Sequence, residues 1–558
     1  MKLSSPSVTL SLRYAFLALA SSTVNAQMMS TSPTSSATPY VRPVSGAAVD
    51  VVSFLTVGDS VNLRADGITP YRFAGIPDGM GAYDNGNGTM TLFVNHEHTT
   101  TANGVNHAHQ APGVVGGSYV SRWIVNTNAG ADFLRVSNGD DLMTSISVTT
   151  AGAGSLTNFN RFCSADLALQ SAFYNPASGK GTTEAIFMTG EESGSNGRVI
   201  AIGAIERKGY EIPAFNASLG AWETACARPY ASDSTVVIAT SDGGANRVFI
   251  YVGTKQDAGT LMERAGLMNG LAYGIQVQVK GANVTSENRD FCFNTSGSAR
   301  YSASFVLATG GTAAGTTFLR PEDGAWDPAN PSDFYFVTTD RLDNLEAGGT
   351  QIGRSRLFRV HFSDVANPLA GGTIEALLVG TEGQNMADNM CVFNDLTGGT
   401  RVIIQEDSGN SSHNAKTWLY TVATDSLQLI LESDKARFGD IGGVAPVAPF
   451  NQDEENSGVI DARDTLGLGW FIGNMQAHYS QPGELVEGGQ LYAFFAPLAV
   501  GSCMSDLSTP LDGMVAGDDL TQLLNNWGSS GRSDIDRNGM TDGADLAILL
   551  GSWGNCGN

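Results

Sequence analysis

The chain has 558 residues, enough for one large domain with an appended unit or for several smaller domains. Its 55 acidic residues against 31 basic ones give a net charge of −24. Nucleic acid is therefore not an expected partner, because phosphate-backbone binding needs clustered lysine and arginine.

Residues 1–26 have the features of an export signal. Lys2 and Arg13 give a positive start, YAFLALA is an apolar core too short to span a membrane, and VNA at 24–26 offers small residues for cleavage. No later apolar run approaches the about 20 residues of a membrane span. We expect a mature protein that is secreted, periplasmic or at the cell surface. The following MMSTSPTSSATP predicts a Ser/Thr/Pro-rich linker over 27–44 with nothing to bury.

Residues 45–500 contain a series of short strand-like runs. Gly, Asn, Asp or Ser turns separate most of them, and helical periodicity is scarce. The runs are TLFV at 91–94, AIFM at 185–188, VVIA at 236–239, VFIYV at 248–252, IQVQV at 275–279, FYFVT at 334–338, LFRV at 357–360, RVIIQ at 401–405, WLYTV at 418–422 and LYAFF at 491–495. So many strands in one unit favour an all-β fold closed by radial repetition, a β-propeller, over a simple sandwich. The pattern alone leaves the number of blades open.

Several of these runs end in carboxylate side chains. AIFMTGEESG brings Glu191 and Glu192 into a glycine-flanked turn, and other acidic residues at or near strand ends are Glu97, Glu223, Asp242, Glu322, Asp327, Glu406, Asp407, Glu455 and Asp461. Alone, the pair would be a solvated turn, and on an extended strand only one of two neighbours could face a shared cavity. In a propeller, however, strand ends surround the central channel. Carboxylates crowded there need cations, and their hard oxygen ligands suit Ca²⁺ and Fe³⁺.

The roles of the cysteines and of the clustered histidines each have more than one interpretation. The six cysteines are too few for a disulfide scaffold in a chain of this length. A bridge between Cys503 and Cys556 would clasp the C-terminal end, whereas the roles of Cys163, Cys226, Cys292 and Cys391 stay open between pairing, burial and metal ligation. His96, His98, His107 and His109 are four of only seven histidines. They form either a second metal site or a polar loop with hydrogen bonds around Glu97.

Eight segments, in one order between about residues 50 and 495, carry a resemblance to a known family: VNHE, NRFCSADL, TGEESG, YVGTKQ, ERAGLMNGLAYGIQV, RPEDGAWDP, QEDSGN and DEENSGVID. They resemble the PhoX-type alkaline phosphatases and the broader secreted family around them. The resemblance implies a six-bladed β-propeller over residues 45–500 with a central cluster of iron and calcium ions. It also implies hydrolysis of phosphomonoesters.

Carried over motif by motif, the resemblance makes Cys163 the iron-bound thiolate, although alone this residue would equally be a buried structural thiol. It assigns metal binding to one or both adjacent glutamates and to further carboxylates: Glu191, Glu192, Glu223, Asp242, Glu322 and Glu97. Arg320 and Glu322 would serve catalysis, with Arg320 holding the phosphate. A phosphate monoester is a dianion, so an acidic protein binds it only where metals and an arginine supply positive charge. Ferric iron would polarise the phosphoryl oxygens.

The C-terminal residues contain two copies of one unit, AGDDLTQLLNNWG and DGADLAILLGSWG. Apolar residues at i, i+3, i+4 and i+7 predict two amphipathic helices: Leu520, Leu523, Leu524 and Trp527, then Leu546, Leu549, Leu550 and Trp553. Before the second helix, oxygen side chains stand at positions 1, 3, 5, 9 and 12 of a calcium loop: Asp534, Asp536, Asn538, Asp542 and Asp545. Gly539 takes the turn position, and the Met540 carbonyl would complete the site.

With Asp at position 12, this loop resembles the dockerin type I loop, and similar repeats cover about 504–556 of a module at 501–558. Counting back from Asp519 puts Pro510 and Ala516 at ligand positions of the first copy, so we expect weak or no calcium binding there.

We therefore expect an exported, calcium- and iron-dependent phosphomonoesterase that acts on a small phosphorylated organic substrate. A protein or surface partner would bind the C-terminal module. One alternative is a non-catalytic calcium-binding propeller for adhesion or surface display. Another is a hydrolase of a different ester, such as a phosphodiester or lactone, on the same fold. Arg320 favours an anionic substrate over a lactone, and Cys163 favours iron over a calcium-only display protein.

Overall fold

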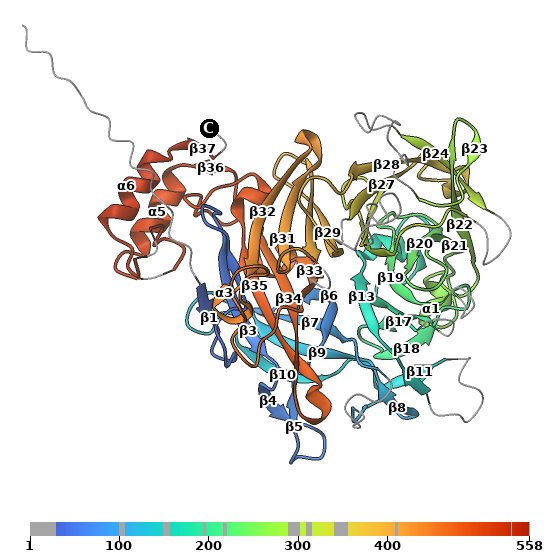
Figure 1. The fold of residues 1–558 in the computed structure, drawn as a ribbon, viewed down its shortest axis with the longest axis horizontal. Helices are drawn as coiled ribbons and strands as arrows, with labels where there is room; N and C mark the ends of the chain where they lie inside the picture. The colour runs from blue at the N-terminus through green and yellow to red at the C-terminus, as the bar shows by residue number, and fades with distance from the viewer. Residues whose placement is uncertain are drawn as a thin grey trace, which may run out of the picture.

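The computed structural model describes residues 29–99, 107–148, 157–193, 197–215, 220–287, 302–308, 315–339, 355–407, 411–529, 531–536 and 538–556. The expected export signal and Cys292 lie outside these residues. The described chain is mostly β-sheet in a propeller-like arrangement (Figure 1). Within it, no helix is both long enough and apolar enough to cross a bilayer.

Four sheets of four or five strands each contain one antiparallel meander. The first has β6 (Pro77–Asp84), β7 (Thr89–His96), β9 (Tyr119–Asn126) and β10 (Val136–Asp141). The second has β13 (Phe162–Leu167), β16 (Ile186–Glu191), β17 (Val199–Gly203), β18 (Lys208–Glu211) and β11 (Ser145–Ser147). The third has β29 (Ala387–Asn394), β30 (Thr400–Glu406), β31 (Lys416–Thr421), β32 (Ser426–Ser433) and β2 (Val41–Pro43). The fourth has β33 (Glu454–Asp461), β34 (Trp470–Ser480), β35 (Glu487–Phe495), β3 (Asp50–Thr56) and β1 (Met29–Thr31).

A fifth, ten-stranded sheet holds two more meanders, which β24 (Ala303–Ala308) joins by pairing with β22 and β28. One meander is β19 (Trp222–Ala227), β20 (Ser234–Ser241), β21 (Arg247–Thr254) and β22 (Leu271–Val279), with β23 (Ala282–Asn283) on β22. The other is β25 (Pro321–Trp326), β26 (Asp333–Thr338), β27 (Arg356–Phe362) and β28 (Gly372–Leu378).

The remaining elements are short. Strand pairs are β4 (Ser60–Leu63) with β5 (Pro70–Arg72), β8 (Val114–Gly117) with β12 (Thr157–Phe159), β14 (Tyr174–Asn175) with β15 (Lys180–Gly181), and β36 (Met514–Val515) with β37 (Gly554–Asn555). The helices are α1 (Leu261–Arg264), α3 (Lys435–Phe438), α4 (Arg463–Leu466), α5 (Gly517–Asn525) and α6 (Gly543–Gly551). All ten strand-like runs expected from the sequence fall in strands, except that Ala185 of AIFM precedes β16 and Val422 of WLYTV lies beyond the end of β31.

The first strand of each meander packs against the first strand of the next. β6 contacts β13, and the series continues through β19, β25, β29 and β33 back to β6. These six strands, the ring strands below, therefore surround one axis. They approach closely: a Cβ on Gly79 of β6 would lie 2.3 Å from the backbone nitrogen of Ala165 in β13, a separation that only glycine permits.

The segment expected to be a linker is part of the fold. β2 pairs with β32. β1 pairs in parallel with β3, and β3 in turn pairs with β35, the last strand of the propeller in chain order. Tyr40 and Val41 are buried. The linker prediction over 27–44 is thus wrong for 29–44, because two short strands and these apolar side chains complete sheets formed by the C-terminal strands.

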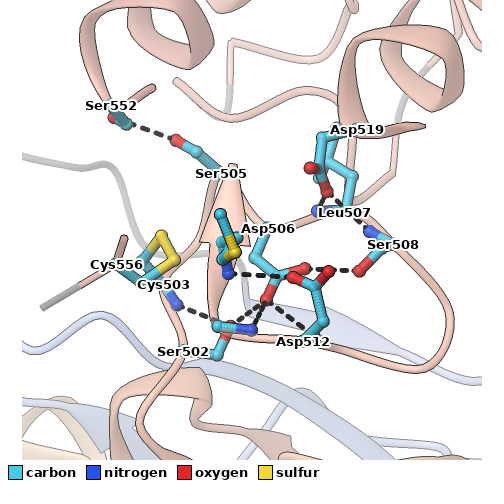
Figure 2. The surroundings of a disulfide bond; sticks show 12 residues. Ser502, Cys503, Ser505, Asp506, Leu507, Ser508, Asp512, Asp519, Ser552 and Cys556 are labelled. Carbon is cyan, nitrogen blue, oxygen red and sulfur yellow. Dashed lines mark hydrogen bonds between the residues drawn. A yellow bond between two sulfur atoms is a disulfide. The ribbon is translucent and has the colours of Figure 1, made fainter. Parts of the chain in front are cut away.

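The C-terminal segment packs against the propeller. Leu507, Leu511 and Val515 belong to the same hydrophobic cluster as Phe471 and Phe494 of the fourth sheet. The Cys503–Cys556 disulfide is confirmed, with Cα atoms 5.3 Å apart (Figure 2).

The apolar stripes of α5 and α6 are only partly covered. Leu523 and Leu549 are buried, but four large side chains at and beyond the helix ends are about half exposed: Leu524, Trp527, Leu550 and Trp553.

Candidate metal centre

All six ring strands begin with the same irregularity. Near its N-terminal end, each contains one residue more than the strand it pairs with, which is a β-bulge. The residue after the last paired position before the bulge is polar or a thiol in every case: Asp78, Cys163, Glu223, Glu322, Asp388 and Asn456. Bulges redirect side chains, and here they place one ligand-type group per ring strand at the same end of the ring.

A second set of acidic residues follows the neighbouring strands. Glu97 comes directly after β7, Glu192 after β16, Asp242 after β20 and Asp407 after β30. In three meanders the spacing from the bulge residue is identical: 19 residues separate Asp78 from Glu97, Glu223 from Asp242, and Asp388 from Asp407. The acidic positions thus repeat with the fold.

The structure brings seven of these side chains together as three overlapping groups. In each group, one ligand atom per residue lies within 4.8 Å of the others: Asp78, Glu97 and Cys163; Cys163, Glu192 and Glu223; Glu223, Glu322 and Asp388. We call these seven residues the acidic centre. Cys163 and Glu223 each belong to two groups, and the Cys163 thiol donates to Glu192 Oε2 at 3.3 Å. Shared ligands of this kind suit a cluster of neighbouring cations.

The electrostatics of the acidic centre favour cations strongly. Burial and the neighbouring carboxylates raise the pKa of Glu192 to about 8 and that of Glu223 to about 7. The same two causes raise the pKa of Asp78, Glu322 and Asp388. The pKa of the Cys163 thiol is also raised, first by burial and then by nearby glutamates. Without metal the raised pKa values favour the protonated forms of these groups, and bound cations would replace those protons.

The donor set fits calcium together with a softer metal. Carboxylate oxygens suit Ca²⁺, whereas a thiolate suits a transition metal such as iron. At the sixth ring position, both polar atoms of the Asn456 side chain are buried and have no hydrogen-bond partner within the described residues. Such orphaned atoms are expected where a ligand completes the site.

Two arginines flank the acidic centre in equivalent positions. Arg161 precedes β13 and Arg320 precedes β25, both with positive φ. Arg161 pairs with Glu97, Nε to Oε1 at 2.8 Å, and with Glu192. Arg320 Nη2 lies 2.9 Å from Asp242 Oδ2 and 3.1 Å from Glu322 Oε1.

These arginines are held by carboxylates yet still reach solvent. Their side chains are 41% and 37% exposed, respectively. In the described part of the chain, Nη1 of each guanidinium has no hydrogen-bond partner. Ile76, Ala221 and Met386 also have positive φ directly before ring strands, so this conformation belongs to the repeated backbone and does not mark the arginines alone.

The adjacent glutamates have different surroundings. Glu192 belongs to the acidic centre, whereas Glu191 forms a buried two-point ion pair with Arg198, one contact being Nη2 to Oε1 at 2.9 Å. Glu191 also accepts the Asn160 backbone N–H at 3.0 Å. Since Arg198 occupies both of its oxygens, we do not include Glu191 among the metal ligands.

Of the other predicted propeller residues, Glu97, Cys163, Glu223 and Glu322 lie in the acidic centre, and Asp242 contacts it through Arg320. The sequence analysis missed Asp78, Asp388 and Arg161. The 19-residue spacing between acidic positions could have revealed the two aspartates. Glu406 is engaged elsewhere, accepting from Trp418 Nε1 at 2.7 Å and the Asn385 N–H at 2.8 Å.

The expected calcium loop is folded around its acidic residues. One carboxylate oxygen from each of Asp534, Asp536 and Asp545 lies within 4.8 Å of the others. Asp545 accepts the backbone N–H groups of Asp536 and Asp542 at 2.9 and 2.7 Å. Gly539 has the positive φ that the turn position needs. Asn538 and Asp542 border the same loop, as the spacing predicts.

The first copy has a different register from the one obtained by counting back from Asp519. Asp506 accepts the Gly513 N–H at 2.8 Å, as Asp534 accepts that of Gly539 at 2.8 Å. Met514 N–H donates to Asp512, as Met540 N–H donates to Asn538.

Asp506, Ser508 and Asp512 therefore correspond to Asp534, Asp536 and Asn538 (Figure 2). Two extra residues, Thr509 and Pro510, lengthen the first loop. The assignment of Pro510 to a ligand position was wrong. Ala516 still corresponds to Asp542 of the second copy, and it offers no side-chain oxygen.

Comparisons with known proteins find no matching family model and no matching curated protein. Several solved structures match at low similarity. Pseudomonas fluorescens PhoX in complex with vanadate is 13% identical with a TM-score of 0.46, covering 81% of this chain and 95% of that one. A protein of unknown function from Dyadobacter fermentans is 8% identical with a TM-score of 0.35, covering 82% and 100%. TolB from Acinetobacter baumannii is 9% identical with a TM-score of 0.28, covering 80% of each chain. These values are too low to assign a family or an activity.

Proposed function

We propose that this protein is an exported, metal-dependent phosphomonoesterase built on a six-bladed β-propeller. The blade number is supported by the six ring strands, each of which starts its own meander and carries the same N-terminal bulge. The ten-stranded sheet then counts as two blades bridged by β24.

The acidic centre with its two flanking arginines is the observation that carries the proposal. Seven ligand-type side chains crowd at one end of the ring, and their raised pKa values mean that the charged forms need compensating cations. A phosphate monoester is itself a dianion. An acidic cluster would repel it unless cations neutralise the carboxylates and arginines add positive charge.

The metal ligands in this proposal are the residues of the acidic centre. Cys163 and Glu192, with Glu223, would hold iron, and the all-carboxylate group of Glu223, Glu322 and Asp388 would hold calcium. Bound cations would supply Lewis acidity toward a phosphoryl oxygen. Asn456, whose amide has no partner among the described residues, would orient a ligand at the sixth position.

Arg320 would hold the substrate phosphate. Asp242 and Glu322 engage its Nε and Nη2 edge and so fix the plane of the guanidinium. Nη1 and the remaining N–H hydrogens are left for phosphate oxygens. As charge spreads over these oxygens in the transition state, a planar two-point contact strengthens. Arg161, held in the same manner by Glu97 and Glu192, would face the substrate from another blade.

Outside the propeller, we propose that residues 1–26 direct export and that the loop at 534–545 binds one Ca²⁺. Asp534, Asp536, Asn538, Asp542 and Asp545 would be its side-chain ligands, with the Met540 carbonyl. The half-exposed Leu and Trp side chains of α5 and α6 support a protein or surface partner for this module.

The test is hydrolysis by the purified mature protein of three chromogenic substrates: a phosphomonoester, a phosphodiester and a lactone. We expect turnover of the monoester alone, lost in chelator and restored by iron with calcium. Preferential turnover of another ester would replace the proposed substrate. Metal content without turnover of any ester would favour a non-catalytic calcium-binding propeller.

A further inference from the structure

A group of imidazole and carboxylate side chains lies in the first meander and shares no residue with the acidic centre. His107 and His109 belong to the segment between β7 and β8, and Asp141 ends β10. One ligand atom from each of the three lies within 4.8 Å of the others. His107 and Asp141 are buried.

The carboxylate and the first imidazole are already in contact. His107 Nε2 lies 2.9 Å from Asp141 Oδ1. Two further hydrogen bonds hold the Asp141 carboxylate. The Tyr71 hydroxyl donates to Oδ1 at 2.9 Å, and the Gln110 N–H donates to Oδ2 at 2.9 Å. The His107 ring stacks on Tyr119 with centroids 3.6 Å apart. Both groups are therefore held in place before any ion binds.

The second imidazole offers an unused lone pair. Nε2 of His109 is buried and has no hydrogen-bond partner among the described residues. The Gly116 backbone favours the protonated form of this imidazole. The unpartnered Nε2 is the nitrogen available to bind a metal.

The nearby histidines are engaged elsewhere. His96 contacts the Gly75 carbonyl at 3.1 Å and the Ser121 hydroxyl at 2.8 Å, and His98 contacts the Gly75 carbonyl at 3.2 Å. Of the four histidines that are clustered in the sequence, only two therefore remain as ligands.

We propose that His107, His109 and Asp141 bind one transition-metal ion, with Zn²⁺ as the fitting ion. Two imidazoles and one carboxylate form a donor set typical of zinc and unlike the all-oxygen sets of calcium. The ion would replace the direct contact between His107 Nε2 and Asp141.

Each ligand has a supporting partner in this arrangement. His107 Nδ1, which is buried and unpartnered within the described chain, lies 3.9 Å from Glu484 Oε2 and would donate to it. Tyr71 and Gln110 hold Asp141, and the Gly116 backbone is near His109. Such outer contacts orient metal ligands and fix their tautomers.

The site would brace the propeller beside the acidic centre. His96 also stacks on Tyr119, with centroids 4.4 Å apart, and the next residue is Glu97. An ion at His107 would thus fix the aromatic stack that His96, the last residue of β7 before Glu97, joins. Its role is structural, so the inference does not depend on the proposed phosphomonoesterase activity.

The test is a Zn²⁺ titration of chelator-treated full-length protein in the Cys163→Ala background, which weakens binding at the acidic centre. We expect one fewer tight zinc site in His107→Ala and in His109→Ala than in the parent. His361→Ala, which alters a half-exposed histidine paired with Asp333, is the matched control and should bind as the parent does. Equal zinc stoichiometry in all four folded proteins would overturn the proposal.

A second readout covers the case in which the histidine variants fail to fold. Co²⁺ bound to the unmodified protein at one equivalent should show imidazole nitrogen coupling in pulsed EPR. The Cys163→Ala protein should show the same coupling. Binding without nitrogen coupling, or no tight Zn²⁺ or Co²⁺ binding at all, would mean that the histidines form a hydrogen-bonded cluster only.

Discussion

Glu191 and Glu192 are adjacent in the chain, but the structure predicts opposite consequences for changing them. In Glu191→Gln, the amide can accept one N–H from Arg198 through Oε1, but its NH₂ group meets the other guanidinium N–H as a second donor. Arg198 would then remain almost buried, with 9% of its side chain exposed, and would lose the carboxylate that it contacts directly. Breaking a buried ion pair by removing one partner costs about 3–5 kcal/mol.

We therefore expect Glu191→Gln to lower the free energy of unfolding by about 3–5 kcal/mol while the folded protein keeps its metal content. Glu192→Gln should do the reverse. It removes one of the crowded carboxylates beside Cys163 and Glu223, so the metal-free protein should be no less stable, whereas metal content and activity should fall.

The assay combines chemical denaturation in chelator with elemental analysis of the folded, metal-loaded proteins. Arg198→Met provides a matched control, because it breaks the same ion pair from the other side and should resemble Glu191→Gln. Loss of metal in Glu191→Gln with retention in Glu192→Gln would refute the assignment of the two glutamates.

Three further predictions concern the arginine, the protons and the C-terminal loop. Arg320→Lys keeps the charge but loses the planar fork that contacts two oxygens. The variant should lose about 2–4 kcal/mol of transition-state binding, so kcat/KM for a phosphomonoester should fall roughly 30- to 1,000-fold. Unchanged turnover would exclude a phosphate-holding role. Metal-free protein should become less stable as pH rises from about 5 to about 8. In the folded protein Glu192 and Glu223 have pKa values of about 8 and about 7, against an ordinary 4.5. They therefore hold protons that the unfolded chain has already released. Metal-loaded protein should lack this slope in denaturation measurements, and an identical slope would contradict cation replacement of those protons. Asp536→Ala should bind one Ca²⁺ fewer than the parent by calorimetric titration, while Asp518→Ala, at an exposed position of α5, should match the parent; equal stoichiometry in both variants would contradict calcium binding by this loop.

The sequence revealed the middle strands of the sheets but not the ring strands. Runs such as VFIYV and the VII of RVIIQ are continuously apolar because sheets cover both of their faces. Ring strands such as PEDGAW and PDGMGAYD contain proline, glycine and acidic residues, a composition that predicts turns. They are strands nonetheless, because the crowded axis admits small residues and the channel end needs polar ones.

The difference between the middle strands and the ring strands also explains which residues of the acidic centre the sequence identified. Motif resemblance led to Cys163 and Glu322, and strand ends led to Glu97 and Glu192. Asp78 and Asp388 were missed because both lie on ring strands that the pattern did not identify. The sequence left open whether one or both of the adjacent glutamates face a shared cavity, and strand alternation could not choose between them. That choice depends on Arg198, whose position is set by pairing between β16 and β17.

Long-range pairing also limited the reading of the chain ends. The Ser/Thr/Pro-rich composition of 29–44 did not reveal its two short strands. These strands form by pairing with β3 and β32, and composition alone does not show that pairing. In the C-terminal module, counting a fixed loop length missed the insertion of Thr509 and Pro510. Only backbone hydrogen bonds to Asp506 reveal the register of that loop.

Elemental analysis of the purified protein and its Cys163→Ala variant tests the central claim most directly, namely that the acidic centre is a mixed metal site. The account predicts iron together with calcium in the parent, and loss of iron with retention of fold in Cys163→Ala. Calcium alone in the parent, or the same iron content in both proteins, would contradict it.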